Sequence, residues 1–213
     1  MDFEQYLSSG NLTGYCVKIT TMIDKKFFNQ LKKRYQTSGQ GRRQLSEMSN
    51  QAQSLSKQAI FASQRGDLNQ AAALLKQAEQ QLFNGQKLVR QIEDLENQGS
   101  YRAAWEEFAE AKLFYNYLTT GNLGAIIKTE LPVEVYIGAV SDLVGEMVRY
   151  AVKLATDGQG VKVGAVVKVA TIITAILGEM NLTGGLRSKY DQARHHLRRL
   201  EDIQYDLAIK HRA

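Results

Sequence analysis

The chain has 213 residues, of which 44% are hydrophobic and 23% are charged, and its formal net charge at pH 7 is +5. These proportions exclude a disordered or fibrous chain. The sequence contains one proline, where average usage of about 5% would give roughly ten, so we expect a mostly helical protein. The single cysteine, Cys16, excludes an internal disulfide and a cysteine-based zinc site and is typical of a reducing, cytoplasmic compartment. Residues 1–10 lack the basic start and apolar run of a secretory signal.

The first expected element is a long helix whose periodicity starts near Ile19, and residues 1–18 before it are expected to be an N-terminal tail. A polar stretch at 37–41 either breaks this helix or lies on the solvent side of a longer one. The apolar stripe then resumes and continues over residues 45–62. Asp67 follows a glycine and is the expected N-cap of the next helix, because its carboxylate can accept the free N–H groups of the first turn.

The rest of the chain shows the same helical period, interrupted by short polar breaks. Ser100 is a plausible cap, and Pro132 stands where proline is tolerated, at the first turn of a helix. The expected helices after the first span residues 68–95, 101–118, 132–156, 163–180 and 186–209. The sequence therefore predicts one all-α domain over residues 19–213, a bundle of six or seven helices, several of them long.

The segment 163–180 is apolar on nearly all sides, so we expect it at the centre of the bundle. The most apolar window, 161–177, contains Lys162 and Lys168 and is shorter than the roughly 20 residues that span a bilayer. We interpret it as a buried helix of a soluble protein, with no membrane partner.

Charge is unevenly distributed along the chain. The balance is +6 over residues 1–66, −4 over residues 67–183 and +3 over residues 184–213. Basic ends around an acidic middle suit a polyanionic partner that meets an acidic metal site, although a mid-sized domain can carry +5 by chance.

Two pairs of acids share a helix face. Glu107 and Glu110 are three residues apart, and Asp142 and Glu146 are four apart. Each pair lies beside an apolar stripe, where like charges repel unless a cation or a proton separates them. Carboxylates on facing helices are how bundles hold divalent ions, and all-oxygen ligands suit Mg²⁺ or Mn²⁺ better than zinc. The alternative is that these are ordinary surface acids.

The histidines carry a weaker signal. His195 and His196 fall in the expected last helix, and His211 falls just after it. We expect them to be exposed, with contacts to phosphates at most.

Several motifs together resemble the family of translin and translin-associated factor X. The run LRSKYD and the run LEDIQYDL resemble the family's closing helix, YIGAVSDLVGE its core motif, and AIFASQRGD the end of its first long helix. Along the chain, AIFASQRGD spans 59–67, YIGAVSDLVGE 136–146, LRSKYD 186–191 and LEDIQYDL 200–207, which is the order of these motifs in the family. The resemblance covers roughly residues 20–211.

The resemblance distinguishes two kinds of family member by their acids. Translin-associated factor X, the catalytic kind, has acids at the positions that match Glu107, Glu110, Asp142 and Glu146. Translin itself has a basic and a bulky apolar residue at the first two positions and an apolar one at the third. The chain is therefore similar to the nuclease-competent kind. The resemblance implies a homo-oligomeric shell, an octamer, that binds single-stranded RNA or DNA and cleaves RNA with Mg²⁺ or Mn²⁺ held by the four acids.

Basic side chains are the expected contacts to the nucleic-acid backbone, with a solvated helix face as the alternative. The candidates are Arg102, Arg187, Lys189, Arg194, Arg198 and Arg199, with a weaker case for Lys32, Lys33 and Arg34. Two rival functions stay open: a non-catalytic single-strand binding protein, and a helical scaffold that binds no nucleic acid.

Overall fold

The computed structural model of the chain describes residues 24–92, 95, 98–126 and 131–210. In these residues every regular element is helical, so the all-α prediction is confirmed. The elements, in chain order, are α3 (Lys25–Arg65), α4 (Leu68–Gln91), α5 (Gly99–Thr119), α6 (Val133–Thr156), the short 3₁₀ turn η1 (Gly160–Lys162), α7 (Val163–Glu179) and α8 (Gly184–Lys210). The expected tail, the expected helix start at Ile19, and His211 lie outside the described residues.

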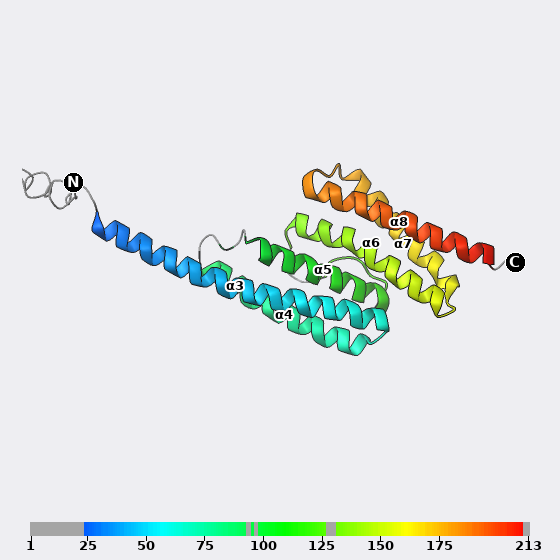
Figure 1. The fold of residues 1–213 in the computed structure, drawn as a ribbon, viewed down its shortest axis with the longest axis horizontal. Helices are drawn as coiled ribbons and strands as arrows, with labels where there is room; N and C mark the ends of the chain where they lie inside the picture. Colours follow the sequence, from blue (N-terminus) through cyan, green and yellow to red (C-terminus); the bar gives the residue numbers. More distant parts are fainter. Residues whose placement is uncertain (1–23, 93–94, 96–97, 127–130, 211–213) are drawn as a thin grey trace, which may run out of the picture.

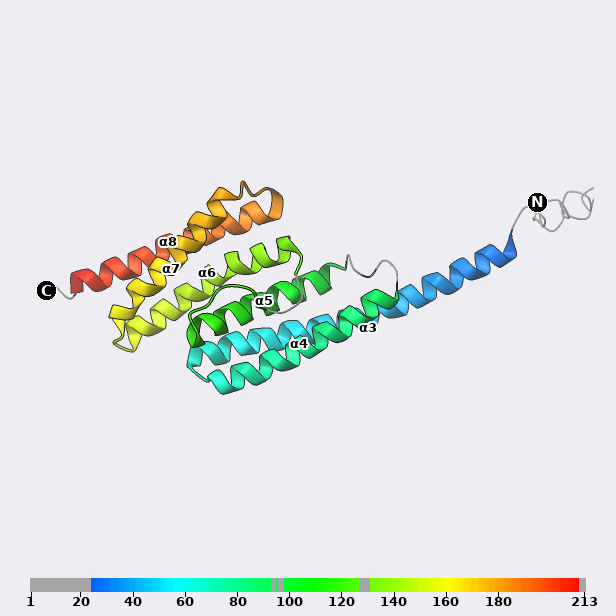
Figure 2. The same cartoon turned by 180° about the vertical axis from the view of Figure 1, so that it is seen from behind.

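The helices form a layered bundle in which each packs on its neighbours in the chain (Figure 1). α3 and α4 make an antiparallel pair, α5 packs on both, and α6 packs on α5. α7 and α8 cover the side of α6 away from α4 (Figure 2). Fully buried Phe108 and Phe114 of α5 and Leu143 and Met147 of α6 form the centre of the core. The α5–α6 interface is therefore the middle of the molecule.

The polar stretch at 37–41 does not break α3, which is continuous over 41 residues. Gly41 is buried, and a Cβ there would stand 2.6 Å from the Ile92 side chain, so the glycine lets α3 approach the end of α4. Before Gly41 no residue of α3 is buried, and the helix projects beyond the bundle as a free arm (Figures 1 and 2).

The helix ends in the structure agree with some of the caps and boundaries predicted from the sequence and differ from others. Asp67 is the N-cap of α4, as predicted, because its carboxylate accepts the Gln70 N–H at 3.0 Å. Ser100 is not a cap: α5 begins at Gly99, after Gln98, which makes no side-chain capping bond. α4 ends at Gln91, earlier than expected, although Leu95 is still fully buried.

The prediction that residues 163–180 lie at the centre of the bundle is wrong. α7 buries one side against α6 and α8, while Ile172 and Ile176 on its other side are each 50% exposed. By length and composition alone Gly160–Glu179 is apolar enough to cross a membrane, a property that the core helices of soluble proteins share. The helix that is apolar on nearly all sides thus lies at the edge of the bundle, with an apolar face that no described residue covers.

Candidate functional site

The four acids singled out by their spacing come together where α5 meets α6. α5 carries Glu107 and Glu110, and α6 carries Asp142 and Glu146. The two helices approach closely at Gly138, where a Cβ would collide with the carboxylate of Glu106. A glycine at this turn therefore brings the acidic edge of α5 against that of α6.

The acids lie near enough to affect one another's protonation. Burial first, and then the negative charges of Asp142, Glu146 and Glu107, raise the pKa of Glu110 to about 9, against the opposing charge of Lys189. Burial likewise raises the pKa of Glu107, which Lys57 lowers and which Asp142 and Glu146 raise. A half-buried carboxyl that faces the charges of three other acids holds a proton, or accepts a cation, at neutral pH.

Neighbouring side chains hold Glu146 and Glu107 in place. Glu146 is only 8% exposed, and the Gln64 amide donates to its carboxylate Oε2 and to its backbone carbonyl, both at 3.1 Å. Arg149 pairs with the other carboxylate oxygen at 3.2 Å. Lys57 of α3 stands 3.7 Å from Glu107. α3 therefore supplies a cation and an amide to the acidic cluster from the side.

Lys189 does not lie on a free basic face. Its ammonium group pairs with Asp142 and, at 2.8 Å, with Glu106. Burial lowers the pKa of Lys189, but its hydrogen bonds to Asp142 and Glu106 outweigh burial and raise that pKa. The lysine from α8 is thus the cation that Asp142 meets. Glu106 belongs to this network although its spacing did not single it out.

The donor set suits a hard divalent ion, because all four groups are carboxylates. In the part of the chain that the structure describes, however, no three His, Cys, Asp or Glu side chains are placed to share one metal ion. The chemistry of the residues fits Mg²⁺ or Mn²⁺. Their present positions leave Asp142 paired with Lys189 instead.

His196 is a site residue that the sequence reasoning missed. It is half-buried, and a Cβ at Gly145 would stand 3.3 Å from its Nε2. Burial lowers its pKa, His195 and Arg149 lower it too, and Asp142 and Glu146 raise it. The signal in the sequence was the glycine between these two acids, which leaves room for a side chain from another helix.

The other expected nucleic-acid contacts lie outside the cluster. Arg102 stands 4.0 Å from Glu134 beside a cavity of about 520 Å³ that Lys189 and Glu106 also line. On α8 the guanidinium groups of Arg187 and Arg194 lie over the Tyr190 ring, at 5.7 and 5.8 Å from its centroid.

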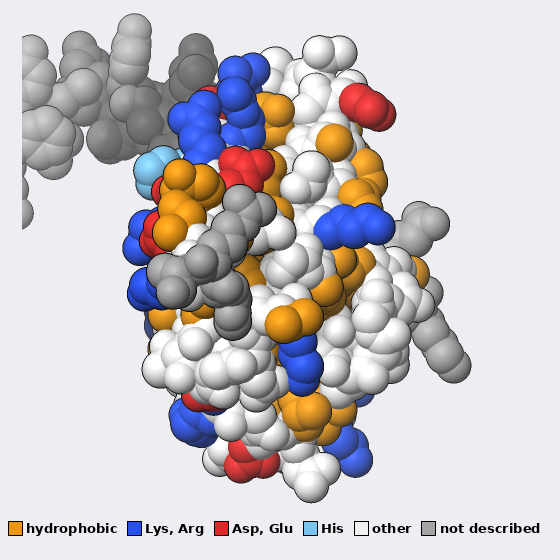
Figure 3. Space-filling view, turned by 90° about the vertical axis from the view of Figure 1, so that its right-hand side faces the viewer, with side chains coloured by type: hydrophobic (Ala, Val, Ile, Leu, Met, Phe, Trp, Pro, Cys, Tyr) orange, Lys and Arg blue, Asp and Glu red, His pale blue; other side chains and the backbone are white. Residues whose placement is uncertain are grey.

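Arg198 and Arg199, also expected to contact nucleic acid, are exposed on α8. Figure 3 looks onto the end of the bundle where α8 ends and shows Lys and Arg side chains scattered among hydrophobic ones. Among the described residues visible in this view, the basic side chains form no single patch.

Residues 40–211 of the chain match the Translin family. No protein with a curated description matches the sequence. Among solved structures, apo-NeC3PO is 17% identical with a TM-score of 0.78, and the AfC3PO–duplex RNA complex is 22% identical with the same score. Each likeness covers 86% of this chain and 97% of the other chain and shows a shared fold. The match over most of its length, together with the shared helical fold, shows that the chain belongs to the Translin family.

Proposed function

We propose that the chain is a nuclease-competent member of its family, which binds single-stranded RNA or DNA and cleaves RNA at the four-acid cluster with Mg²⁺ or Mn²⁺. The observation that carries the proposal is the position of Glu110 among the other three acids, where burial first and then their charges raise its pKa to about 9. A cluster of like charges with so much mutual repulsion is stabilised by a divalent cation.

The comparisons support the nucleic-acid part of the proposal. A structural relative was solved as a complex of AfC3PO with duplex RNA. The likeness to the catalytic kind of member rests on acids at Glu107, Glu110, Asp142 and Glu146, where translin itself lacks most of them.

The chain's own residues would divide the work of phosphodiester hydrolysis. A divalent ion held by the four acids would lower the pKa of a bound water and offset charge on the pentavalent phosphorus. Gln64 and Arg149 orient the two oxygens of the Glu146 carboxylate. Glu110 holds a proton at neutral pH until a cation replaces it. Lys189, which pairs with Asp142 here, would be left to pair with a phosphate if a divalent ion took its place beside Asp142.

The deciding experiment is single-turnover cleavage of a single-stranded RNA in Mg²⁺ and in Mn²⁺. Asp142→Asn keeps the size of the side chain but removes the charge that holds a divalent ion, so we expect loss of cleavage with the fold and RNA binding retained. Glu201→Gln, at an exposed acid of α8, is the matched control and should cleave at the wild-type rate. Equal rates for wild type and Asp142→Asn would refute the metal site.

A non-catalytic single-strand binding protein is the alternative, and one observation favours it. Lys189 already neutralises Asp142 and Glu106, so the cluster can persist as a structural ion-pair network. In that case RNA would bind and stay intact in either metal.

Assembly and location belong to the same proposal. We infer a homo-oligomer, an octamer by family resemblance, that works in the cytoplasm. The exposed aliphatic face of α7 supports assembly, because monomers rarely leave such a stripe in water. From the sequence, Phe114, Tyr115 and Tyr117 are also candidates for such a contact, because they lie outside the obvious apolar stripes. Phe114 is fully buried, so it belongs to the core of the subunit.

A further inference from the structure

The α3 arm is defined as residues 25–43, which are the projecting part of α3 before Gly41 and the residues where the helix joins the bundle. The arm takes no part in the acidic cluster. Most of it, residues 25–39, precedes the part of the chain that matches the family. No residue of the arm before Gly41 is buried, and Phe27, Phe28, Leu31 and Tyr35 are between 46% and 73% exposed. The arm is therefore a surface that the fold of one subunit does not explain.

The arm is strongly and uniformly basic. The stretch contains seven Lys or Arg residues and no Asp or Glu, and Asp24 before it is the N-cap of α3. The basic residues are Lys25, Lys26, Lys32, Lys33, Arg34, Arg42 and Arg43. A rod of this charge attracts a polyanion.

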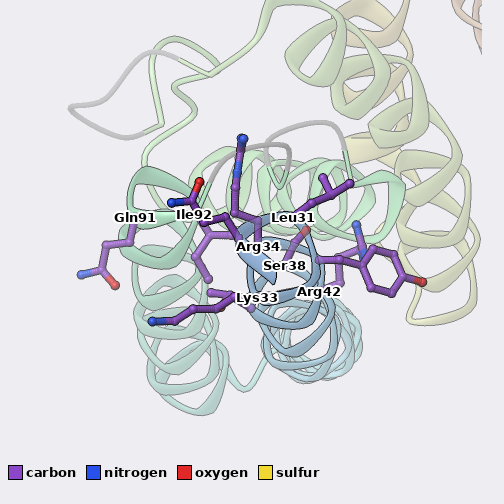
Figure 4. Close-up of a pocket in the computed structure, with 10 residues that line it drawn as sticks. Leu31, Lys33, Arg34, Ser38, Arg42, Gln91 and Ile92 are labelled. Atoms are coloured by element: carbon purple, nitrogen blue, oxygen red, sulfur yellow. The ribbon is translucent and has the colours of Figure 1, made fainter. Parts of the chain in front are cut away.

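Two hollows lie around Tyr35, where the arm joins the bundle. One has a volume of about 730 Å³ and is lined by Lys33, Arg34 and Arg42 (Figure 4). The other, of about 630 Å³, is lined by Arg42 and Arg43. Tyr35 lines both hollows, is 73% exposed, and carries the Arg42 guanidinium over its ring at 5.9 Å. In the described residues that line them, neither hollow contains an acid.

We propose that the α3 arm is a second nucleic-acid-binding surface, which takes a single-stranded RNA segment outside the acidic cluster. Lys33, Arg42 and Arg43 bind successive phosphates, and the Tyr35 ring stacks on a base. Positive charge that follows a strand, with an aromatic ring between the charges, is the chemistry of sequence-tolerant single-strand binding. The inference rests on the proposed nucleic-acid binding and is independent of cleavage.

The placement of the arginines argues against a membrane as the partner. At 100° per residue, the four exposed apolar residues of the arm fall within an arc of about 100° on the helix. Arg42 falls inside that arc and Arg34 beside it, whereas a helix that inserts into a bilayer surface keeps its charges on the opposite face. A second copy of the arm is also disfavoured, because two such rods repel each other.

The arm lies far from the acids along the same helix. Tyr35 and Lys57, which contacts Glu107, are 22 residues apart, or about 33 Å along an α-helix at 1.5 Å per residue. The arm therefore holds a different part of the strand from the part at the cluster.

The test is RNA binding by fluorescence anisotropy, in EDTA so that no cleavage occurs, with a 20-nucleotide single-stranded RNA. The triple variant Lys33→Gln/Arg42→Gln/Arg43→Gln should bind at least about tenfold more weakly, with a salt slope shallower by about 2, since each single-strand phosphate contact contributes about 0.7. Tyr35→Ala should bind at least about fivefold more weakly with the salt slope unchanged, because stacking releases no counterions.

The matched control is Lys76→Gln/Lys87→Gln/Lys162→Gln, which removes three exposed charges elsewhere and should bind like wild type. If wild type binds RNA and the arm variants bind equally well, the arm proposal is wrong and the proposed function stands. If wild type binds no RNA, both are wrong.

Two further readouts identify another occupant of the arm. Loss of binding to phosphatidylserine vesicles by the triple variant, with RNA affinity unchanged, would make the arm a membrane contact. If light scattering shows a smaller mass for the triple variant than for wild type, with RNA affinity unchanged, the arm would be a contact between copies of the chain. Either result overturns the RNA proposal.

Discussion

At the scale of single residues, Glu110 links stability to pH. Its folded pKa of about 9 lies above the ordinary glutamate value of 4.5, so between these two pH values the folded state binds a proton that the unfolded state has lost. Stability contributed by this group is fully present below about pH 4.5 and is lost as the pH rises toward 9. Glutamine imitates the protonated form and loses nothing over this range.

We therefore expect Glu110→Gln to melt at a higher temperature than wild type at pH 8 in metal-free buffer, and at a similar temperature near pH 4.5. Thermal melts across this range check the prediction. Glu201→Gln, at an exposed acid, should follow the wild-type curve at every pH. A constant offset between Glu110→Gln and wild type would mean that packing, and not protonation, causes the difference.

Lys189 is the second residue with a separable role, as a cation built into the acidic cluster. Lys189→Met leaves Asp142 and Glu106 without their cation, so we expect metal-free stability to fall by about 1–3 kcal/mol, the usual cost of an unpaired half-buried polar group. Mn²⁺ should then stabilise the variant more than wild type, because in the variant the ion no longer competes with the Lys189 ammonium group for the carboxylates. Melting temperatures with and without Mn²⁺ measure both effects. Equal stabilisation of the two proteins would show that the lysine and the metal do not share a place.

At the scale of elements, glycines set how closely the helices pack. A Cβ at Gly85 of α4 would stand 3.0 Å from Leu45 of α3 and 3.1 Å from Tyr101 of α5, whereas one at Gly39 of α3 would meet nothing within 4 Å. Alanine favours a helix interior over glycine by about 1 kcal/mol, and overpacking costs about 1–3 kcal/mol. Gly39→Ala should therefore stabilise the protein by up to about 1 kcal/mol, and Gly85→Ala should destabilise it.

Urea denaturation of the two variants measures their free energies of unfolding. The prediction is that Gly39→Ala is the more stable of the two, whatever the size of each change. If Gly85→Ala were as stable as Gly39→Ala, the α3–α4–α5 crossing would have room to relax, and its glycine would be dispensable.

At the scale of the whole molecule, the apolar face of α7 predicts assembly. Ile172 and Ile176 are half-exposed one helical turn apart, so a lysine at position 176 would place a charge in the middle of that face. We expect wild type to scatter light as a large oligomer and Ile176→Lys to scatter as a smaller species with an unchanged helical content. A wild-type mass equal to one chain would remove both the oligomer and the role of this face.

The sequence alone determined the features that depend on neighbours a few residues away. The helical period predicts the six described helices, Asp67 predicts a cap, and the spacing of the acids predicts two carboxylate pairs on helix faces. Each of these follows from the 3.6-residue repeat of a helix and from hydrogen bonds within one helical turn. Both depend only on residues that are close together in the sequence.

Only the tertiary structure decided which faces meet. Lys189 pairs with Asp142 across 47 residues of chain, and His196 packs on Gly145, because α8 lies against α6. The proton on Glu110 depends on burial between helices and on charges carried by a different helix. α7 lies at the edge of the bundle although its composition suits the centre, because an apolar surface does not specify whether its own chain or another molecule covers it.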